Sequence, residues 1–369
     1  MGSMLFSPYR LRGLELPNRI MVGPMGQYSA RDGCLGAWHL MHLGSMAISG
    51  AGLVVIEATA VNPEGRLSPR DPGLWNDEQE AALAPILAFC REFGGARIGM
   101  QITHSGRKGS VSVAWEHQRV IPVEQGGWVP RAPSPIPYPR RTPPLVLDED
   151  GMDGLVRDFV ATTRRADRLG IELLEIHSAH GYLLHNFLSP LTNQRGDAYG
   201  GSRENRMRFP LAVFDAVRSA WPAHKPLGVR ISAVDWVDGG WSLDDSLAYA
   251  AALKARGCDY VTASSGGAVP EQKIAAAPGY QVPFAEAIRR ATGICTVAVG
   301  LITEPRQAED ILAGGRADLV GLARRMLYDP RWPWHAAVEL GEEFFYPKQY
   351  ERAHPSMQSG DFLRPSRAA

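Results

Sequence analysis

Two histidines and a tyrosine stand close together in the segment His177-Ser178-Ala179-His180-Gly181-Tyr182. Two imidazoles three residues apart can bind zinc, but a catalytic zinc site takes three protein ligands and this segment offers no third. The same imidazoles can hydrogen-bond one substrate oxygen and stabilise the negative charge that develops there. One histidine can also simply cap the loop. The spacing alone does not decide between these hypotheses, and Tyr182, a weak proton donor beside them, favours acid chemistry.

Cationic side chains form a second group of candidates. Arg230 ends an apolar run, where a charged side chain is costly unless it meets an anion or a negative dipole. Gly300 closes another apolar run and lets backbone amides approach a ligand, while Arg324 offers a bidentate fork for a phosphate. A surface ion pair is the alternative for Arg324. No second carboxylate accompanies Glu57 in a comparable position, so glycoside hydrolysis is disfavoured.

A regular alternation of elements must position these residues. Short runs rich in β-branched residues are apolar on both faces, which is typical of strands in a buried parallel sheet. These runs lie at residues 20–22, 53–57, 97–103, 173–177, 227–231, 260–264, 296–300 and 318–321. Helical patterns lie between them and include residues 77–93, 154–169, 204–220, 243–256 and 304–313.

Eight strands alternating with helices fit either a doubly wound sheet or a closed barrel. The doubly wound sheet needs a dinucleotide glycine signature after its first strand, and Gly23-Pro24-Met25-Gly26 lacks that GxGxxG spacing. The count of eight therefore predicts a single eight-stranded parallel β/α (TIM) barrel over residues 4–343. Such barrels carry their active site at the carboxyl ends of the strands, and often bind phosphate after strands seven and eight. The candidate residues all fall at these positions.

Local signals mark several helix ends. Asn76 and Ser242 precede two of the predicted helices as N-caps. Gly170, Gly257 and Gly314 follow helix ends, where a left-handed cap prefers glycine.

Two stretches fall outside the barrel pattern. Residues 121–146 are rich in proline, which removes backbone donors, so this excursion is predicted to be neither helix nor inner strand. It is either an inert loop or a substrate lid. Residues 344–369 lose the barrel periodicity and are predicted to form a C-terminal tail.

The composition excludes several classes of protein. Lysine plus arginine equals aspartate plus glutamate at 39 each, so the basic excess of a nucleic-acid binder is absent. No apolar run approaches the roughly 18 residues that a membrane-spanning helix needs. The four cysteines form no CxxC pair, which disfavours iron–sulfur and structural zinc sites. We expect reduced thiols and a cytoplasmic protein, because the first residues also lack the features of a signal peptide.

Taken together, the strand-end motifs resemble the Old Yellow Enzyme family of FMN-dependent ene-reductases, and most closely its thermophilic-like subgroup. The resemblance covers nearly the whole chain. It rests on Asn18-Arg19-Ile20, Pro24-Met25, Glu57-Ala58-Thr59-Ala60-Val61, Gln101 with His104-Ser105-Gly106-Arg107-Lys108, His177 to Leu183, and Asp197 to Arg206. These motifs are specific in combination, although each alone is weak.

The resemblance implies a role for each candidate residue. Pro24, Met25, Gly26, Ala58 and Gln101 would line the flavin ring, Arg230 would lie at its N1/O2 edge, and Gly300 and Arg324 would hold the FMN phosphate. His177 and His180 would bind the carbonyl oxygen of the substrate, Tyr28 would cover the substrate, and Tyr182 would donate the proton. Arg352 would enter the site of a neighbouring subunit, which implies a homodimer or a dimer of dimers.

The implied activity is NAD(P)H-dependent reduction of the C=C bond of small activated alkenes, namely enones, enals, maleimides and nitroalkenes, by hydride transfer from reduced FMN. Two alternatives stay open: a family member specialised for aromatic thioesters or desaturation, and a non-catalytic barrel that binds a phosphorylated ligand. One departure concerns Gly26, because the subgroup commonly has cysteine at this position beside the flavin. The flavin potential and the substrate range of this chain therefore need not match those of the subgroup.

Overall fold

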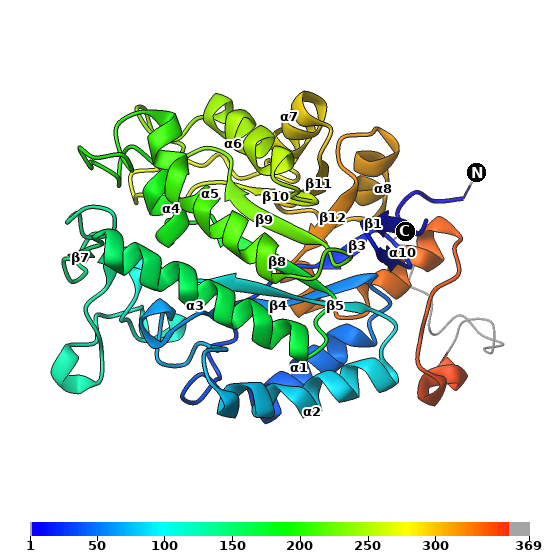
Figure 1. Cartoon of the computed structure of the whole chain (residues 1–369). Coiled ribbons are helices and arrows are strands. Elements are labelled where there is room, and N and C mark those ends of the chain that lie inside the picture. The colour runs from blue at the N-terminus through cyan, green and yellow to red at the C-terminus, as the bar shows by residue number, and fades with distance from the viewer. Residues whose placement is uncertain (1, 354–369) are drawn as a thin grey trace.

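A closed barrel of eight parallel strands forms the centre of the computed structural model, which describes residues 2–353 (Figure 1). Its strands are β3 (Ile20–Val22), β4 (Leu53–Ala60), β5 (Arg97–Thr103), β8 (Leu173–Ser178), β9 (Leu227–Ser232), β10 (Tyr260–Ser264), β11 (Cys295–Ala298) and β12 (Leu319–Leu322). Each strand pairs with its neighbours in chain order, and β12 closes the barrel on β3. The predicted TIM barrel and its eight strands are confirmed.

Helices surround the barrel. The main ones are α1 (Ala37–Ala47), α2 (Asp77–Phe93), α3 (Glu149–Arg168), α5 (Arg203–Ala220), α6 (Leu243–Ala255), α7 (Val282–Thr292) and α8 (Pro305–Ala313). Three shorter ones are α4 (Leu183–Leu188), α9 (Arg324–Tyr328) and α10 (Trp332–Leu340). No helix within residues 2–353 is long and apolar enough to cross a membrane.

The predicted helix ends are mostly confirmed. Asn76 and Ser242 cap α2 and α6 with their side chains. Helix α3 begins five residues before the predicted start, because Asp148 accepts a hydrogen bond from the Gly151 amide and caps it there. The prediction for Gly314 is wrong: it has a right-handed φ of −74°, and the next glycine takes the left-handed conformation.

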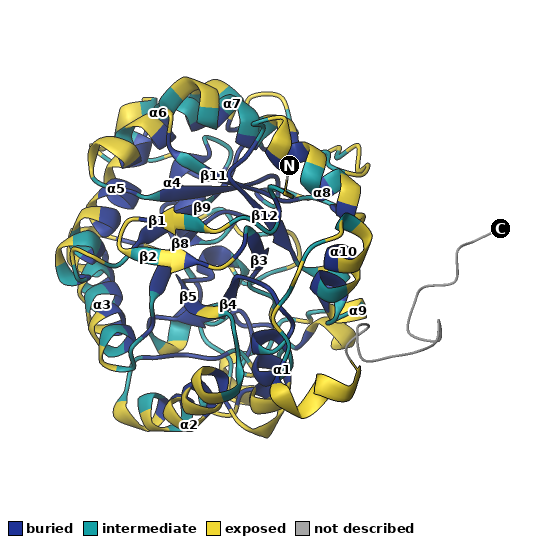
Figure 2. Ribbon diagram, turned by 90° about the vertical axis from the view of Figure 1, so that its right-hand side faces the viewer, coloured by how far each residue is buried: buried dark blue, intermediate teal, exposed yellow. Residues whose placement is uncertain are grey.

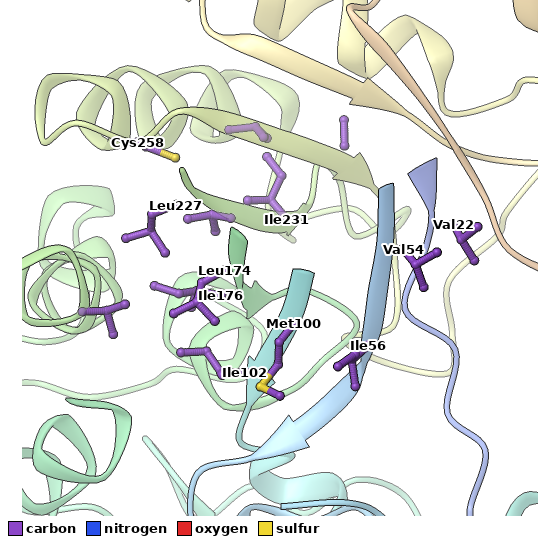
Figure 3. Close-up of a cluster of buried hydrophobic side chains, with 14 of the residues drawn as sticks. Val22, Val54, Ile56, Met100, Ile102, Leu174, Ile176, Leu227, Ile231 and Cys258 are labelled. Atoms are coloured by element: carbon purple, nitrogen blue, oxygen red, sulfur yellow. The ribbon is translucent and has the colours of Figure 1, made fainter. Parts of the chain in front are cut away.

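Alternation along the strands divides the core into two layers. Side chains such as Val54, Ile56, Met100 and Ile102 belong to the large cluster that packs against the helices (Figure 3). The alternate residues of the strands point inward. Together with Leu53 of β4 they form a second cluster, which fills the barrel interior. The hairpin of β1 (Tyr9–Leu11) and β2 (Leu14–Leu16) covers that interior cluster at the amino end of the barrel (Figure 2). The apolar interior thus occupies one end, and polar side chains are left for the other.

The excursion at 121–146 contains one turn of 3₁₀ helix, Val123–Gln125, and both strands of a two-residue ladder, β6 (Arg131–Ala132) and β7 (Leu145–Val146). It supplies no barrel strand, as predicted, while the 3₁₀ turn departs from the prediction that it contains no helix. The tail lies at the other end of the molecule, drawn in red in Figure 1. Phe344 stacks on Trp334 of α10, and Tyr346 and Tyr350 contact the same ring edge to face. The predicted tail 344–369 extends beyond residue 353, outside the described residues.

Candidate active site

The strand register brings the inward polar residues into contact at the carboxyl end of the barrel. Gln101 of β5 pairs with Glu175 of β8, and Arg230 of β9 pairs with both His177 of β8 and Thr262 of β10. A register shift in β4 between Ile56 and Thr59 turns Glu57 and Ala58 toward the same carboxyl end of the barrel. Five neighbouring strands therefore deliver polar groups to one small volume.

A buried carboxylate lies beneath these groups. Glu175 accepts hydrogen bonds from Gln101 Nε2 at 2.7 Å and from the Thr262 hydroxyl. Burial raises the pKa of Glu175, and the charge of Arg230 acts in the opposite direction. Burial lowers the pKa of Arg230, and Glu175 opposes this shift. Glu175 thus supplies a countercharge to the Arg230 guanidinium in the barrel floor.

Two adjacent cavities open above this floor. The first, of about 160 Å³, collects nine of the predicted site residues: Pro24, Gly26, Tyr28, Ala58, Gln101, His177, His180, Tyr182 and Arg230. The second, of about 260 Å³, is lined by Gly300 and Arg324, and again by His180 and Arg230. Because these last two residues line both cavities, the cavities are neighbours across them.

The glycine and the arginine of the second cavity are placed as phosphate ligands would need to be. Gly300 has a φ of +107°, and a Cβ added there would lie 2.9 Å from Gln281 Oε1. Only glycine fits this turn without strain. The Arg324 side chain follows β12 and forms no ion pair with any carboxylate of residues 2–353. This end of the cavity thus offers a tight backbone turn and an unneutralised positive charge.

The two histidines of the motif face each other. His177 Nε2 lies 3.3 Å from His180 Nδ1, and His180 Nε2 lies 2.7 Å from the Ser264 hydroxyl. His177 Nδ1 accepts a hydrogen bond from the Ala179 amide, so its hydrogen lies on Nε2 and points at His180. His180 adopts a φ of +58° to present its ring here, where Gly181 and Gly267 pack too closely to admit a Cβ.

Burial sets the charge of both rings. It lowers the pKa of His177 and of His180 well below the ordinary value, and the charges of Arg230 and Lys108 lower both further. Both imidazoles are therefore neutral near neutral pH and act as hydrogen-bond donors rather than as cations. Within residues 2–353, no group of three His, Cys, Asp or Glu side chains could hold a metal ion.

The two tyrosines close the first cavity. The Tyr182 ring packs on His177 at 4.7 Å between centroids, and Tyr28 meets Trp115 edge to face at 5.8 Å. Burial raises the pKa of Tyr182 above its usual range, and the charge of Asp71 adds to that shift. Tyr182 therefore holds its proton firmly until a strong base forms beside it.

Comparison with known proteins identifies the family. The model of the NADH:flavin oxidoreductase / NADH oxidase family matches residues 4–343. The chain belongs to this family. It is 46% identical over 355 residues to an NADPH dehydrogenase of Geobacillus sp. (strain WCH70), covering 95% of this chain and 99% of that protein. It is 42% identical to the NADPH dehydrogenase of Halalkalibacterium halodurans, over 96% of this chain and 99% of the relative.

Solved structures agree with this assignment. Morphinone reductase superposes with a TM-score of 0.78 at 27% identity, over 97% of this chain and 93% of that one. The resemblance to the Old Yellow Enzyme family is confirmed, and the chain is an FMN-dependent NAD(P)H oxidoreductase. A 2-naphthoyl-CoA reductase also superposes, with a TM-score of 0.82, over 92% of this chain and 52% of that chain. At 23% identity this last likeness shows the fold alone.

The site of this flavin oxidoreductase fits a mononucleotide. Arg230 Nε is buried and has no hydrogen-bond partner among the described residues, so it can meet an anionic edge of a flavin. The cavity that it shares with Gly300 and Arg324 suits a phosphate, and the one that it shares with Gln101 and Ala58 suits a ring. One elongated ligand can therefore extend from Arg324 to Gln101.

Two predicted site residues lie elsewhere. Met25 is partly buried and packs against the large core cluster rather than lining either cavity. Arg352 is exposed in the 3₁₀ segment Lys348–Ala353, which follows Phe345, a residue that packs at Gly50 and Gly95 before strands β4 and β5.

Some residues that line the cavities were not predicted from the sequence as site residues. Glu57 and Ser264 were included only as the last residues of two predicted strands. Asp71 and Leu67 lie in the loop between β4 and α2, where nothing in the pattern marked them. The signal that did exist was the position of this loop, which leaves the carboxyl end of a barrel strand.

Proposed function

We propose that the chain is an ene-reductase that acts on activated alkenes such as enones, enals, maleimides and nitroalkenes. The 3.3 Å separation of His177 Nε2 and His180 Nδ1 is the observation that carries this proposal. Two neutral imidazoles whose nitrogens converge on one point suit a carbonyl or nitro oxygen that gains negative charge. Bound FMN, reduced by NAD(P)H, would supply the hydride for the alkene carbon.

The hydrogen-bond pattern of the histidines explains how a substrate oxygen would be received. In the structure, His177 donates to His180 Nδ1, and His180 Nε2 donates to the Ser264 hydroxyl. A substrate oxygen placed between the rings needs the hydrogen of His180 on Nδ1 instead. The Ser264 hydroxyl can reverse its role and donate to Nε2, because a hydroxyl is both donor and acceptor. Ser264 thereby supports the tautomer that binds the oxygen.

A panel of acceptors tests the proposal directly. Enzyme reduced anaerobically with one equivalent of dithionite is mixed with cyclohexenone, N-ethylmaleimide or a nitroalkene, and the return of the oxidised flavin spectrum is followed. We expect re-oxidation with formation of the saturated product. Cyclohexanone, which has the carbonyl but no C=C bond, serves as the control and should leave the flavin reduced. Failure of every alkene to re-oxidise the enzyme would sink the proposal.

We also propose that the protein is at least a dimer in which Arg352 completes a partner's site. The tail packs at the amino end of the barrel, where Phe345 lies against Gly95 and Gly50. The Arg352 guanidinium therefore lies far from the cavities of its own chain. Phe345 and Tyr350 each remain more than 40% exposed, at 42% and 43%. This leaves apolar surface for a neighbouring subunit.

Replacing Arg352 by alanine should raise the KM for the alkene or the nicotinamide by about 10–100-fold while the FMN content stays at one per chain. The reason is the loss of one charged hydrogen-bond donor, which in other proteins contributes about 1.5–3 kcal/mol. Steady-state kinetics with light scattering after size exclusion measures both properties. Arg290→Ala, another exposed arginine, is the matched control. A fully active monomer, or unchanged kinetics in Arg352→Ala, would show that the tail is only a surface segment.

A further inference from the structure

An aspartate in the first cavity has no role so far. Asp71 lines this cavity together with Tyr28, Tyr182 and the two histidines. Its carboxylate is held from below: Oδ1 accepts from the Ser68 hydroxyl at 2.7 Å, and Oδ2 accepts from the Leu67 amide at 2.9 Å. Both bonds come from its own tight turn, so the carboxylate is fixed with its remaining acceptor capacity toward the cavity.

Among residues 2–353, no cation forms an ion pair with the Asp71 carboxylate. The nearby Arg66 places its guanidinium over the rings of Trp75 and Trp128, at 5.4 and 5.1 Å, and donates to the backbone oxygens of Pro63 and Pro69. The Arg66 guanidinium therefore has other partners, although the charge of Asp71 opposes the lowering of the Arg66 pKa by burial.

The other groups that face Asp71 make its charge less favourable. Glu57 of β4 adds a second carboxylate, which accepts from the Gln27 amide at 2.7 Å. Tyr28 and Tyr182 present phenols whose pKa values are raised in part by the charge of Asp71. Burial, with a smaller contribution from Glu57, raises the pKa of Asp71 to about 6, against the hydrogen bonds from Ser68 and Leu67 that lower it. Asp71 therefore binds and releases a proton close to neutral pH.

We propose that Asp71 is a positioning residue for Tyr182 that resupplies the proton which Tyr182 gives to the substrate. This inference rests on the proposed ene-reductase function. In the first step the Tyr182 O–H bond breaks, and the electron pair of the substrate's enolate forms a new C–H bond with that proton. In the second step the O–H bond of the Asp71 carboxylic acid breaks, and its proton goes to the Tyr182 phenolate oxygen. Solvent water then reprotonates the carboxylate, and no group changes oxidation state.

The arrangement favours this order of events. A phenolate beside a charged Asp71 would place two negative charges in one cavity, which is costly at low dielectric. Transfer of the proton leaves the single charge on Asp71, where the Ser68 hydroxyl and the Leu67 amide stabilise it. The cavity of about 160 Å³ also has room for a water to bridge the two groups.

The test follows steady-state turnover of NADPH and cyclohexenone from pH 5 to pH 9, because Tyr182 must regain its proton between successive turnovers. In the wild type the rate should fall as pH rises through the titration of Asp71. Asp71→Asn should be slower by about tenfold or more at pH 6 and should lose this pH dependence, since general acid–base groups contribute about 10²–10⁴-fold. Asp71→Asn combined with Tyr182→Phe should be no slower than Tyr182→Phe alone. Asp153→Asn, an exposed aspartate of α3, is the control.

A second variant keeps the proposal testable if Asp71→Asn fails to fold. Ser68→Ala removes one hydrogen bond from the charged carboxylate, so it should shift the pH profile to higher pH with the maximal rate kept. Reduction of the flavin by NADPH involves no proton from Tyr182 and should change less than about twofold in each variant. If Asp71→Asn slows the reaction but keeps the pH dependence, or if Ser68→Ala leaves the profile in place, the proposal is overturned. A wild-type enzyme that no alkene re-oxidises would instead overturn the proposed function.

Discussion

Replacing His177 and His180 together by alanine should slow re-oxidation of the reduced enzyme by an enone about 10⁴-fold or more, because each donor aimed at a developing oxyanion contributes about 10²–10³ in comparable sites. Reduction of the flavin by NADPH should change far less, since no oxyanion forms in that half-reaction. Binding of a phenol should weaken as well, because its phenolate oxygen imitates the enolate oxygen between Nε2 of His177 and Nδ1 of His180. Stopped-flow kinetics of the two half-reactions and a spectral titration measure these effects.

Single variants refine this result. His180→Asn keeps an amide that can still donate, so we expect it to retain more activity than His180→Ala. His224→Ala alters an exposed histidine remote from the cavities and serves as the control. Equal losses in both half-reactions, or zinc that is bound by the wild type and lost in the variants, would contradict the oxygen-binding role.

Removal of the phosphate ligands should produce a colourless protein. Arg324→Ala removes a charged donor worth about 1.5–3 kcal/mol, which corresponds to about a 10–100-fold weaker affinity for FMN. Gly300→Val should be more severe, because a side chain is strained at a φ of +107° and its Cβ would lie 2.9 Å from Gln281. Flavin content after purification and fluorescence titration of the apoprotein measure the loss.

The matched control for this prediction is Arg306→Ala, which removes an exposed arginine from α8. Chromatography of the flavin released by denaturation from the wild type should give FMN. Release of FAD, or retention of FMN at wild-type affinity in Gly300→Val, would show that these two residues do not hold the phosphate.

The barrel was predictable because its strands carry apolar residues on both faces. Val54 and Leu53 illustrate this, since the first packs on helices and the second fills the interior. The site residues at strand ends followed from the same pattern, because parallel strands bring their carboxyl ends together. Helix boundaries were less certain, and the early cap at Asp148 was missed although aspartate is a good N-cap.

What the sequence did not reveal depends on contacts between distant segments. The hydrogen bond from His180 to Ser264 joins residues 84 positions apart, and no local pattern encodes it. Asp71 looks like an ordinary turn aspartate because Ser68 satisfies it locally, and only the folded cavity places it beside Tyr182. Met25 adjoins residues that line the first cavity, yet its side chain packs into the core, since neighbouring residues on a loop do not share a direction.

The position of the tail has a consequence for how the enzyme behaves on dilution. Within one chain the barrel separates the tail from the cavities, so the two cannot influence each other by contact. Any effect of Arg352 on turnover then requires a second copy, and specific activity becomes a function of enzyme concentration near the dissociation constant of the assembly. Assays at nanomolar and micromolar enzyme would sample different molecular species, and kinetic constants would be comparable only when the chain concentration is stated.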